Sequence, residues 1–259
     1  LLLLFSLLCN GQSPKLFTTD KELSSSLINQ IYQDRNGFIW IATEDGLNRY
    51  DGAKFTIYKH EPNNEHSLAH NFVRTVFEDS KGHLLIGTYI GIQMYDPATD
   101  NFTPLAKLED TGETLESNIN SFIERKNGEI WVSGNVLCKL DIKDHLLTVR
   151  KVDIAVTSPG SLFEDKKQNV WMAKGEEGVY QLTPDNQLTL HLSKDNGYVK
   201  SICEDQRGNI YVGSIRKGLF IYDKERKTFV PVDLKEKGEL PVCFLYSGIP
   251  NELYIGKIG

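Results

Sequence analysis

Three of the six histidines lie close together in the sequence, at His60, His66 and His70. Imidazole is a common ligand of zinc, and these spacings on a polar connection could bring ring nitrogens around one metal ion. Histidines on a solvated loop would show the same spacing without binding a metal. The sequence therefore supports no assignment of a metal, and no motif in it indicates a cofactor.

Adjacent pairs of carboxylates recur along the chain, as in Glu164-Asp165 and Glu204-Asp205. General acid and base catalysis needs one asymmetric pair with separate roles. Because these pairs recur with a repeating phrase, they indicate turn chemistry rather than a catalytic pair. The sequence also has no phosphate-binding loop, zinc-protease motif, nucleophile elbow or EF-hand loop. We predict no catalytic residue and no enzymatic activity for this segment.

Composition indicates which elements have to position any functional residue. The 259 residues carry a net charge of −6. Such a chain offers no basic surface to nucleic acid, so we predict no nucleic-acid contact. Glycine occurs 21 times and aromatic residues make up 10%, which favours strands over helices. No run of about 18 apolar residues occurs, which is the length that a membrane-spanning helix needs.

One phrase recurs along the chain at intervals of 40 to 46 residues. In its first copy, Asp34 and Gly37 fit a type I turn between two strands. We expect the large residue of each copy to wedge between neighbouring repeats. The fourth copy has Gln168 where the others have the turn glycine, which makes its first hairpin the weakest prediction. The residues that we assign to these structural roles are Gly37, Trp40, Gly82, Leu85, Gly128, Trp131, Trp171, Gly208 and Tyr211.

Each repeat divides into four short strands, which is the pattern of a β-propeller blade. We predict an all-β fold, a β-propeller of four-stranded blades with five full blades and part of a sixth, drawn from a seven-bladed ring. Lys15 to Thr18 is expected to supply the outer strand of the last blade. The expected blade limits are 22–60, 67–105, 116–152, 158–192, 197–232 and, for the partial blade, 240–259, within a propeller segment spanning 14–259.

The N-terminal residues 1–13 differ from the rest of the chain. Leu1 to Leu8 is almost entirely apolar and is followed by small and polar residues, which is typical of the end of a secretory signal peptide cut near Gly11. A buried strand is the alternative, and Cys9 raises a lipoprotein interpretation, although the preceding Leu8 is large for it. The other three cysteines have unrelated spacings, so they fit core positions better than a disulfide framework.

The recurring phrase resembles the two-component regulator propeller repeat. The first copy shows that pattern at Asp34, Gly37, Ile39, Trp40, Ile41, Thr43, Gly46 and Leu47, and it closes with Tyr50-Asp51. The resemblance covers residues 16–259. It implies the periplasmic sensor region of a Bacteroidetes hybrid two-component histidine kinase, exported by its signal peptide and held in the inner membrane. Gln168 and a third blade that is one residue short depart from the pattern.

The resemblance also implies what lies around this segment. It implies further blades that complete two propellers, a sandwich domain, a membrane helix, a histidine kinase, a receiver and a DNA-binding domain. Such proteins bind oligosaccharides or other small molecules, act as homodimers and control the transcription of genes for glycan use.

One face of the predicted propeller varies between blades. The second-to-third turns share that face with the connections between blades, and both sets differ in sequence, whereas the other turns are monotonous. Variable loops on a regular scaffold are where binding surfaces form. Tyr89 could stack on a sugar ring, and Arg216 could hold hydroxyls or a carboxylate. The predicted ligand-binding residues are Tyr89, Arg216, Glu44 and Asn135.

Three classes of function stay open at this point. The leading one is a ligand-sensing propeller that passes its signal by phosphorelay to a histidine kinase. The second is a propeller-fold carbohydrate-active enzyme, a lyase or a glycosidase, which would need paired carboxylates at the central channel. The third is a protein-interaction scaffold. Binding of an oligosaccharide without turnover would favour the sensor, turnover would favour the enzyme, and neither would favour the scaffold.

Overall fold

The structure is a computed structural model that describes residues 17–19, 22–192, 197–234, 242–246 and 252–257. The predicted signal remnant at 1–13 lies outside these ranges. Every regular element within them is a β-strand, and none is a helix. The predicted all-β fold is therefore confirmed.

Within the described ranges, six sheets follow one another along the chain, and we call them blades 1 to 6. Blade 1 is β1 Ile28–Gln33, β2 Ile39–Thr43, β3 Gly46–Tyr50 and β4 Phe55–Tyr58. Blade 2 is β5 Val73–Glu78, β6 Leu84–Thr88, β7 Ile92–Asp96 and β8 Asn101–Phe102. Blade 3 is β10 Ser121–Glu124, β11 Ile130–Ser133, β12 Leu137–Lys143 and β13 Leu146–Lys151, with β9 Lys107–Leu108 at its edge. Blade 4 is β14 Leu162–Glu164, β15 Val170–Lys174, β16 Gly178–Leu182 and β17 Leu188–Leu192. Blade 5 is β18 Val199–Glu204, β19 Ile210–Ser214, β20 Gly218–Asp223 and β21 Thr228–Pro231, and blade 6 contributes β22 Val242–Tyr246 and β23 Tyr254–Lys257.

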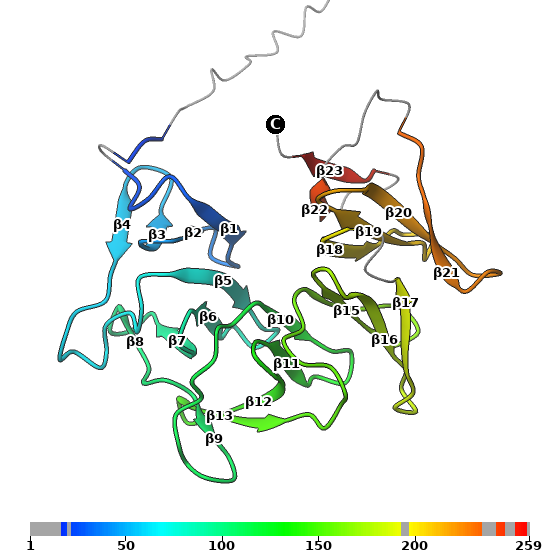
Figure 1. Ribbon diagram of the computed structural model, residues 1–259. Helices are drawn as coiled ribbons and strands as arrows, with labels where there is room; N and C mark the ends of the chain where they lie inside the picture. The colour runs from blue at the N-terminus through cyan, green and yellow to red at the C-terminus, as the bar shows by residue number, and fades with distance from the viewer. Residues whose placement is uncertain (1–16, 20–21, 193–196, 235–241, 247–251, 258–259) are drawn as a thin grey trace, which may run out of the picture.

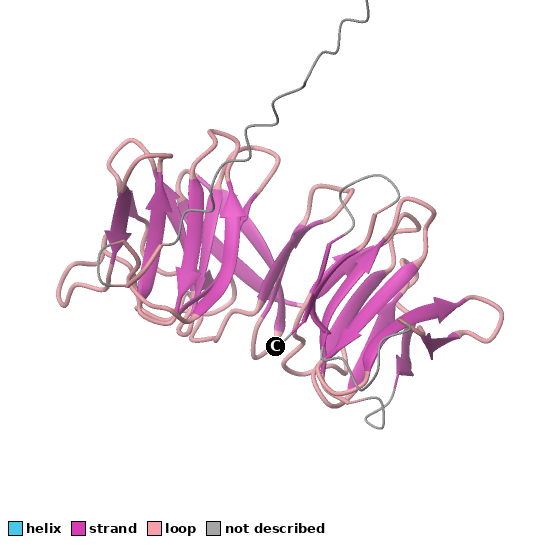
Figure 2. Ribbon diagram, turned by 90° about the horizontal axis from the view of Figure 1, so that it is seen from above, coloured by secondary structure: helices cyan, strands magenta, loops and turns pink. Residues whose placement is uncertain are grey.

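The blades stand around a common centre (Figure 1). The first strand of each blade lies at the inner edge of its sheet, and the first strands of neighbouring blades contact one another. Figure 2 shows the loops gathered at the two ends of the strands, so the molecule has two loop faces. This arrangement is that of a β-propeller, as predicted.

The aspartate of the repeated phrase organises the turn between the first and second strands. Asp34 Oδ1 accepts hydrogen bonds from the backbone N–H groups of Asn36 and Phe38, at 2.9 and 3.0 Å. Its Oδ2 accepts from Trp40 Nε1 at 2.8 Å. The same carboxylate therefore fixes the turn and orients the large residue of the next strand. In blade 3 the phrase has no aspartate, and Glu129 accepts from Trp131 Nε1 at 3.0 Å instead.

The large residue of each phrase packs against the following blade. Trp40 shares a buried cluster with residues of blade 2, such as Val76 and Ile86. Trp171 does the same with Ile202 and Phe220 of blade 5. Leu85 and Trp131 are buried in the equivalent way, and Tyr211 is half-buried. These clusters form the core of the molecule, so the core lies between blades rather than within any one of them.

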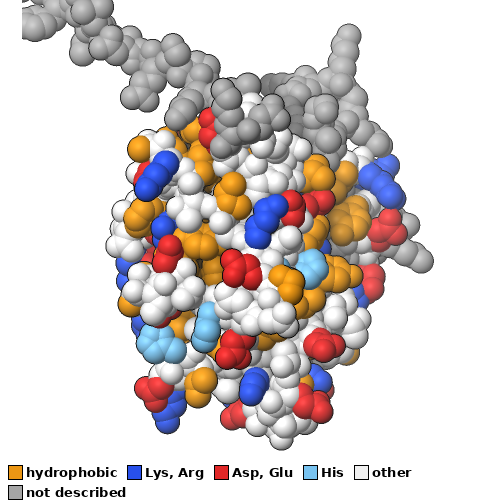
Figure 3. Space-filling model, turned by 90° about the vertical axis from the view of Figure 1, so that its left-hand side faces the viewer, with side chains coloured by type: hydrophobic (Ala, Val, Ile, Leu, Met, Phe, Trp, Pro, Cys, Tyr) orange, Lys and Arg blue, Asp and Glu red, His pale blue; other side chains and the backbone are white. Residues whose placement is uncertain are grey.

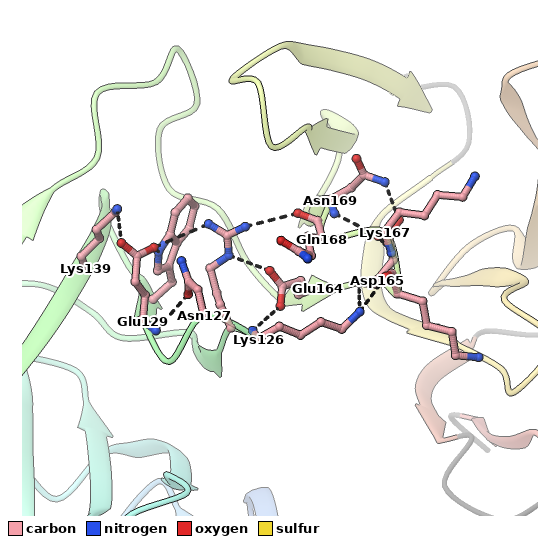
Figure 4. A network of polar contacts seen from close by, with 12 residues as sticks. Lys126, Asn127, Glu129, Lys139, Glu164, Asp165, Lys167, Gln168 and Asn169 are labelled. Atoms are coloured by element: carbon pink, nitrogen blue, oxygen red, sulfur yellow. Dashed lines mark hydrogen bonds and ion pairs between the residues drawn. The ribbon is translucent and has the colours of Figure 1, made fainter.

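A glutamate at the end of the first strand connects each of blades 2 to 5 to the preceding blade. Glu78 of blade 2 accepts a hydrogen bond from the backbone N–H of Arg35 in blade 1, at 2.8 Å. Glu164 of blade 4 accepts in the same way from Lys126 of blade 3, at 2.7 Å (Figure 4). The equivalent glutamates are Glu124, which accepts from Ser80, and Glu204, which accepts from Lys166. The recurring Glu-Asp pair thus has two structural roles, because the aspartate caps a turn and the glutamate links two blades.

Gln168 occupies the glycine position of the blade 4 hairpin without breaking it. Its φ of 66° lies in the left-handed region, as do the 88° of Gly37 and the 78° of Gly208. The strands β14 and β15 keep a regular antiparallel register around the turn. The conformation of the hairpin therefore does not require glycine, but a residue with a Cβ is strained there.

Replacing Gln168 by glycine should raise the free energy of unfolding by about 0.5–1 kcal/mol. The left-handed conformation costs an L-residue about 1–2 kcal/mol, and glycine avoids this cost. Glycine also has more freedom in the unfolded chain, which offsets part of the stabilisation. Denaturant unfolding measures the change. Gln187→Gly, in an exposed turn without a positive φ, is the matched control and should destabilise. A loss of stability in both variants would contradict the expectation.

Two parts of the structure differ from simple repetition. Blade 3 has a fifth strand, because β9 pairs in parallel with the outer strand β13. The connection that carries β9 is a polar insertion without strand periodicity, so no sequence pattern predicts this strand. Phe17, which precedes the first repeat, packs edge-on against Tyr50 and Phe55 of blade 1, with ring centroids 5.2 and 5.0 Å away. Its ring finds aromatic partners at the outer hairpin of blade 1. Lys15 and Leu16 lie outside the described residues, so the outer strand expected from Lys15 to Thr18 stays a prediction.

Candidate ligand-binding site

One loop face combines the second-to-third turns with the connections between blades, and we call it the variable face. Backbone hydrogen bonds tie the two sets of loops together. Gly46 N–H donates to Asn71 O at 2.6 Å, Tyr89 N–H to Phe72 O at 3.0 Å, and Ile215 N–H to Tyr198 O at 2.8 Å. The loops predicted to carry a binding surface therefore lie together at one end of the strands.

A hollow of about 640 Å³ opens on the variable face between blades 2 and 3. The turn from β6 to β7 supplies Tyr89, and the turn from β11 to β12 supplies Asn135. The connection that precedes β10 closes the third side. The residues that line the hollow are Tyr89, Ile90, Leu105, Thr114, Glu116, Ser117, Asn118 and Asn135. Its volume suits a small ligand.

Asn118 gives this hollow an unused polar group. Its side-chain oxygen Oδ1 is buried and has no hydrogen-bond partner among the described residues. An acceptor that is buried without a hydrogen-bond partner costs stability. Ser201 Oγ is the other such atom in the described ranges, but it is not among the residues that line this hollow.

Tyr89 is the aromatic wall of the hollow and is 54% exposed. Its ring lies 5.6 Å from the ring of His70 and 6.0 Å from that of Phe72, measured between centroids. These contacts hold the tyrosine ring while leaving much of its surface open. Asn135 and Glu116 are exposed at the rim and are not paired with one another. The hollow thus combines a ring face with amide and carboxylate oxygens.

The other predicted ligand residues lie on the same face but outside this hollow. Glu44 is exposed in the turn from β2 to β3. Arg216 is in the turn from β19 to β20, and its guanidinium lies 3.2 Å from the Glu176 carboxylate. Of the four predicted residues, the structure brings together Tyr89 and Asn135. Sequence reasoning missed Asn118, because an asparagine before an inner strand carries no distinctive signal.

The three clustered histidines contact the backbone of their own and neighbouring loops. His60 Nδ1 lies 2.9 Å from Leu68 O, and His66 Nδ1 lies 3.3 Å from Phe102 O. His70 Nδ1 accepts from Phe72 N–H at 2.9 Å. Within the ranges that the structure describes, no group of three or more His, Cys, Asp or Glu side chains could hold a metal ion.

Charge is evenly mixed on the side of the molecule where β4 and β8 lie. Figure 3 shows acidic and basic side chains interspersed with apolar ones there. Where carboxyl groups of the described residues have a shifted pKa, the shift is downward. Burial of Glu129 would raise its pKa, but hydrogen bonds from Lys139, Trp131 and Asn127 outweigh burial and lower the pKa to about 2. No helix in the described part of the chain is long and apolar enough to cross a bilayer.

The arrangement of the blades around a centre defines this chain as a β-propeller. The hollow between blades 2 and 3 is a candidate ligand site on its variable face. Three segments, residues 22–45, 67–89 and 193–216, match the family described as "Two component regulator propeller". The recurring phrase therefore matches that repeat in three of its copies, as its sequence predicted. A curated relative is histidine kinase P4 of Formosa agariphila, which is 42% identical over 55 residues, or 21% of this chain and 4% of the kinase.

Solved structures share the fold. The extracellular domain of a putative one component system from B. thetaiotaomicron has a TM-score of 0.74 at 17% identity, over 93% of this chain and 36% of that one. The extracellular domain of a putative hybrid two component system from the same organism has a TM-score of 0.60 at 18% identity, over 94% and 40%. A virginiamycin B lyase of Staphylococcus aureus has a TM-score of 0.65 at 13% identity, over 91% and 80%. The chain thus spans 36% and 40% of the two extracellular domains that it resembles.

Proposed function

We propose that this chain is the ligand-sensing propeller of a two-component regulator, and that it binds an oligosaccharide fragment in the hollow between blades 2 and 3. The observation that carries the proposal is a hollow that is lined both by the exposed Tyr89 ring and by Asn118, whose buried Oδ1 has no partner among the described residues. A sugar presents hydroxyl donors to such an acceptor and a flat C–H face to such a ring. The match of three segments to the two component regulator propeller family supports the sensing role.

The proposal includes a location and a context. We propose a periplasmic segment of an inner-membrane protein, exported by a signal peptide, with further blades, a sandwich domain and a kinase in the same polypeptide and a homodimeric receptor that controls glycan-use genes. The names of the relatives, extracellular domains and a histidine kinase, support this context. Ile31 in β1 supports a further blade, because it is 62% exposed while its repeat equivalent Val76 is 1% exposed. A neighbouring blade beside β1, as in a closed seven-bladed ring, would bury Ile31.

An enzymatic function has less support from the same residues. A glycosidase needs a carboxylic acid whose pKa is raised so that it can donate a proton. The shifted carboxyl groups described here, such as Glu129 and Asp205, have lowered pKa values, so they hold their charge. The glutamates near the inner strands are engaged in links between blades. The lyase of similar fold shares the architecture alone.

Signalling requires that the ligand bind two states of the receptor with different affinities. Each complete blade packs on a neighbour through a buried cluster, so we propose that the blades stay rigid and that the signal is a rigid-body shift between this propeller and neighbouring domains. The hollow spans two blades and a connection at the surface, where a ligand can also contact a neighbouring domain.

Tyr89→Ala should weaken the response of the complete receptor to its oligosaccharide by about tenfold or more, because it removes the stacking surface. Asn118→Ala should also weaken it, by removing the hydrogen-bond acceptor. The thermal midpoint of Tyr89→Ala should stay within about 2 °C, because the ring is largely exposed. The readout is a transcriptional reporter in cells, titrated with the oligosaccharide.

Arg216→Ala is the matched control, since Arg216 lies on the same face outside the hollow. Its response should stay near that of the unaltered receptor. A full response from Tyr89→Ala and Asn118→Ala would place the ligand elsewhere. A loss in Arg216→Ala alone would move the site to blades 4 and 5.

A further inference from the structure

The connection between blades 2 and 3 departs from the repeat, and we call its residues 105–116 the insertion hairpin. Leu108 N–H donates to Glu113 O at 2.7 Å, and Leu115 N–H donates to Ala106 O at 2.8 Å, so the segment folds back on itself. Its strand β9 lies beside β13 (Figure 1). Among the described sheets, only that of blade 3 gains a fifth strand in this way.

The insertion hairpin is anchored on two blades. Ala106 and Leu115 are buried in the apolar cluster that joins blades 2 and 3. Ala106 N–H donates to Ile92 O of β7 at 2.9 Å, and Glu109 N–H donates to Val149 O of β13 at 2.9 Å. A wall that is fixed before the ligand arrives loses little freedom on binding, which favours affinity.

A second hollow, of about 750 Å³, adjoins the hollow described above. The two hollows share Thr114, Glu116 and Asn135 in their linings, so they are continuous. Lys107 of β9 and Lys151 of β13 line the second hollow alone. Lys107 pairs with Thr114 in an antiparallel bridge, which places it beside the shared part. We call the second hollow the outer hollow, because β9 and β13 are the outer strands of blade 3.

Four exposed, charged residues line the outer hollow, and they are Lys107, Lys151, Glu113 and Glu116. None of the four side chains has an ion pair within 4.0 Å or a hydrogen bond to another described residue. Two positive and two negative charges cancel. An ammonium group donates hydrogen bonds, a carboxylate accepts them, and a hydroxyl does both. The outer hollow therefore suits a neutral ligand that is rich in hydroxyl groups.

We propose that the outer hollow is a second subsite for the ligand of the first hollow, so that this chain selects neutral oligosaccharides over single sugars. The inference rests on the proposed function. One sugar stacks on Tyr89, and the rest of the ligand crosses Thr114 and Asn135. The far end of the ligand then meets Lys107 and Lys151. Each hollow alone has the volume of a site for a small ligand, so a single sugar fills the first and gains nothing from the outer one.

The test is calorimetric titration of this chain with glucose, xylose and mannose, and with the β-1,4-linked oligosaccharides of each up to the hexasaccharide. In the series that binds, the association constant should rise at least about tenfold from the monosaccharide to the trisaccharide, the effect of roughly one hydrogen bond to a charged group. Lys107→Ala combined with Lys151→Ala should reduce that rise to less than about threefold and leave monosaccharide binding unchanged. Both side chains are exposed, so the double variant should keep its fold.

Lys81→Ala combined with Lys143→Ala is the matched control. It removes the same two charges from exposed positions of blades 2 and 3 at the opposite loop face. The control should keep the full rise with length. The outer subsite is overturned by a flat dependence on length in the unaltered chain, by a rise that persists in the Lys107 and Lys151 variant, or by an equal loss in the control.

Tyr89→Ala separates this inference from the proposed function. It should weaken the binding of every length, the monosaccharide included, whereas the Lys107 and Lys151 variant changes only the gain from length. Sugar binding that depends on Tyr89 but not on length keeps the proposed function and overturns the outer subsite. Absence of binding throughout all three series overturns both.

Discussion

Trp40→Ala is expected to lower the free energy of unfolding by about 3–5 kcal/mol, the typical cost of truncating a large buried aromatic side chain. Trp40 is 1% exposed and lies at the junction of blades 1 and 2. Its ring stacks on Tyr58, with centroids 5.9 Å apart, and meets Tyr95 of blade 2 edge-on at 4.9 Å. Truncation opens a cavity between two blades and leaves Asp34 Oδ2 without its donor.

Thermal and denaturant unfolding measure this effect, and the midpoint temperature should fall by roughly 10 °C. Trp40→Phe keeps much of the packing but loses the hydrogen bond, so it should cost less than the alanine variant. Ile57→Ala, in the same blade but 44% exposed, is the control and should cost below about 1 kcal/mol. If Trp40→Ala and Ile57→Ala proved equally mild, the core would not lie between blades.

Asp165→Ala is also expected to lower the free energy of unfolding by about 3–5 kcal/mol, because it removes a hydrogen-bond acceptor. Its carboxylate accepts hydrogen bonds from the backbone N–H groups of Lys167 and Asn169, both at 2.9 Å. It also accepts from Asn169 Nδ2 and Trp171 Nε1, both at 2.8 Å. Alanine leaves these donors without their acceptor in a buried turn, at about 1–3 kcal/mol for each donor that water cannot reach.

Asp165→Asn separates the contributions, because it keeps one acceptor oxygen and loses the charge. Asp165→Asn should lower the free energy of unfolding by less than the alanine variant does. Asp185→Ala, in an exposed turn of the same blade, should change stability by less than about 0.5 kcal/mol. Equal stability of the Asp165 and Asp185 variants, measured by denaturant unfolding, would contradict the role assigned to the turn aspartate.

The repeated phrase was sufficient to predict the sheets, because its turn and its apolar second strand recur in order. It was not sufficient to predict contacts between repeats. Its recurrence predicts that the glutamate before Asp165 belongs to the turn, yet Glu164 binds the preceding blade. That bond depends on how blades stack, which the local sequence does not encode. The strand β9 was missed because two residues pair with β13 without any strand pattern of their own.

The candidate site was predictable only in outline. Variable loops indicated the face, and Tyr89 and Asn135 were selected as residues able to hold a ligand. These two residues share one hollow because their blades are neighbours, and Arg216 lies outside the hollow. Spacing along the chain does not reveal which blades are neighbours. Asn118 is an ordinary polar residue in the sequence. It stands out only because burial leaves its side-chain oxygen unpaired.

The central claim is that this propeller binds an oligosaccharide and does not transform it. Calorimetric titration of the chain with a panel of glycan oligosaccharides, with chromatographic analysis of each mixture afterwards, tests that claim most directly. The expected result is saturable binding of at least one oligosaccharide that is lost in Tyr89→Ala, with every oligosaccharide recovered intact. Shortened or unsaturated products would contradict the claim in favour of an enzyme, and absence of binding across the panel would contradict it in favour of a scaffold.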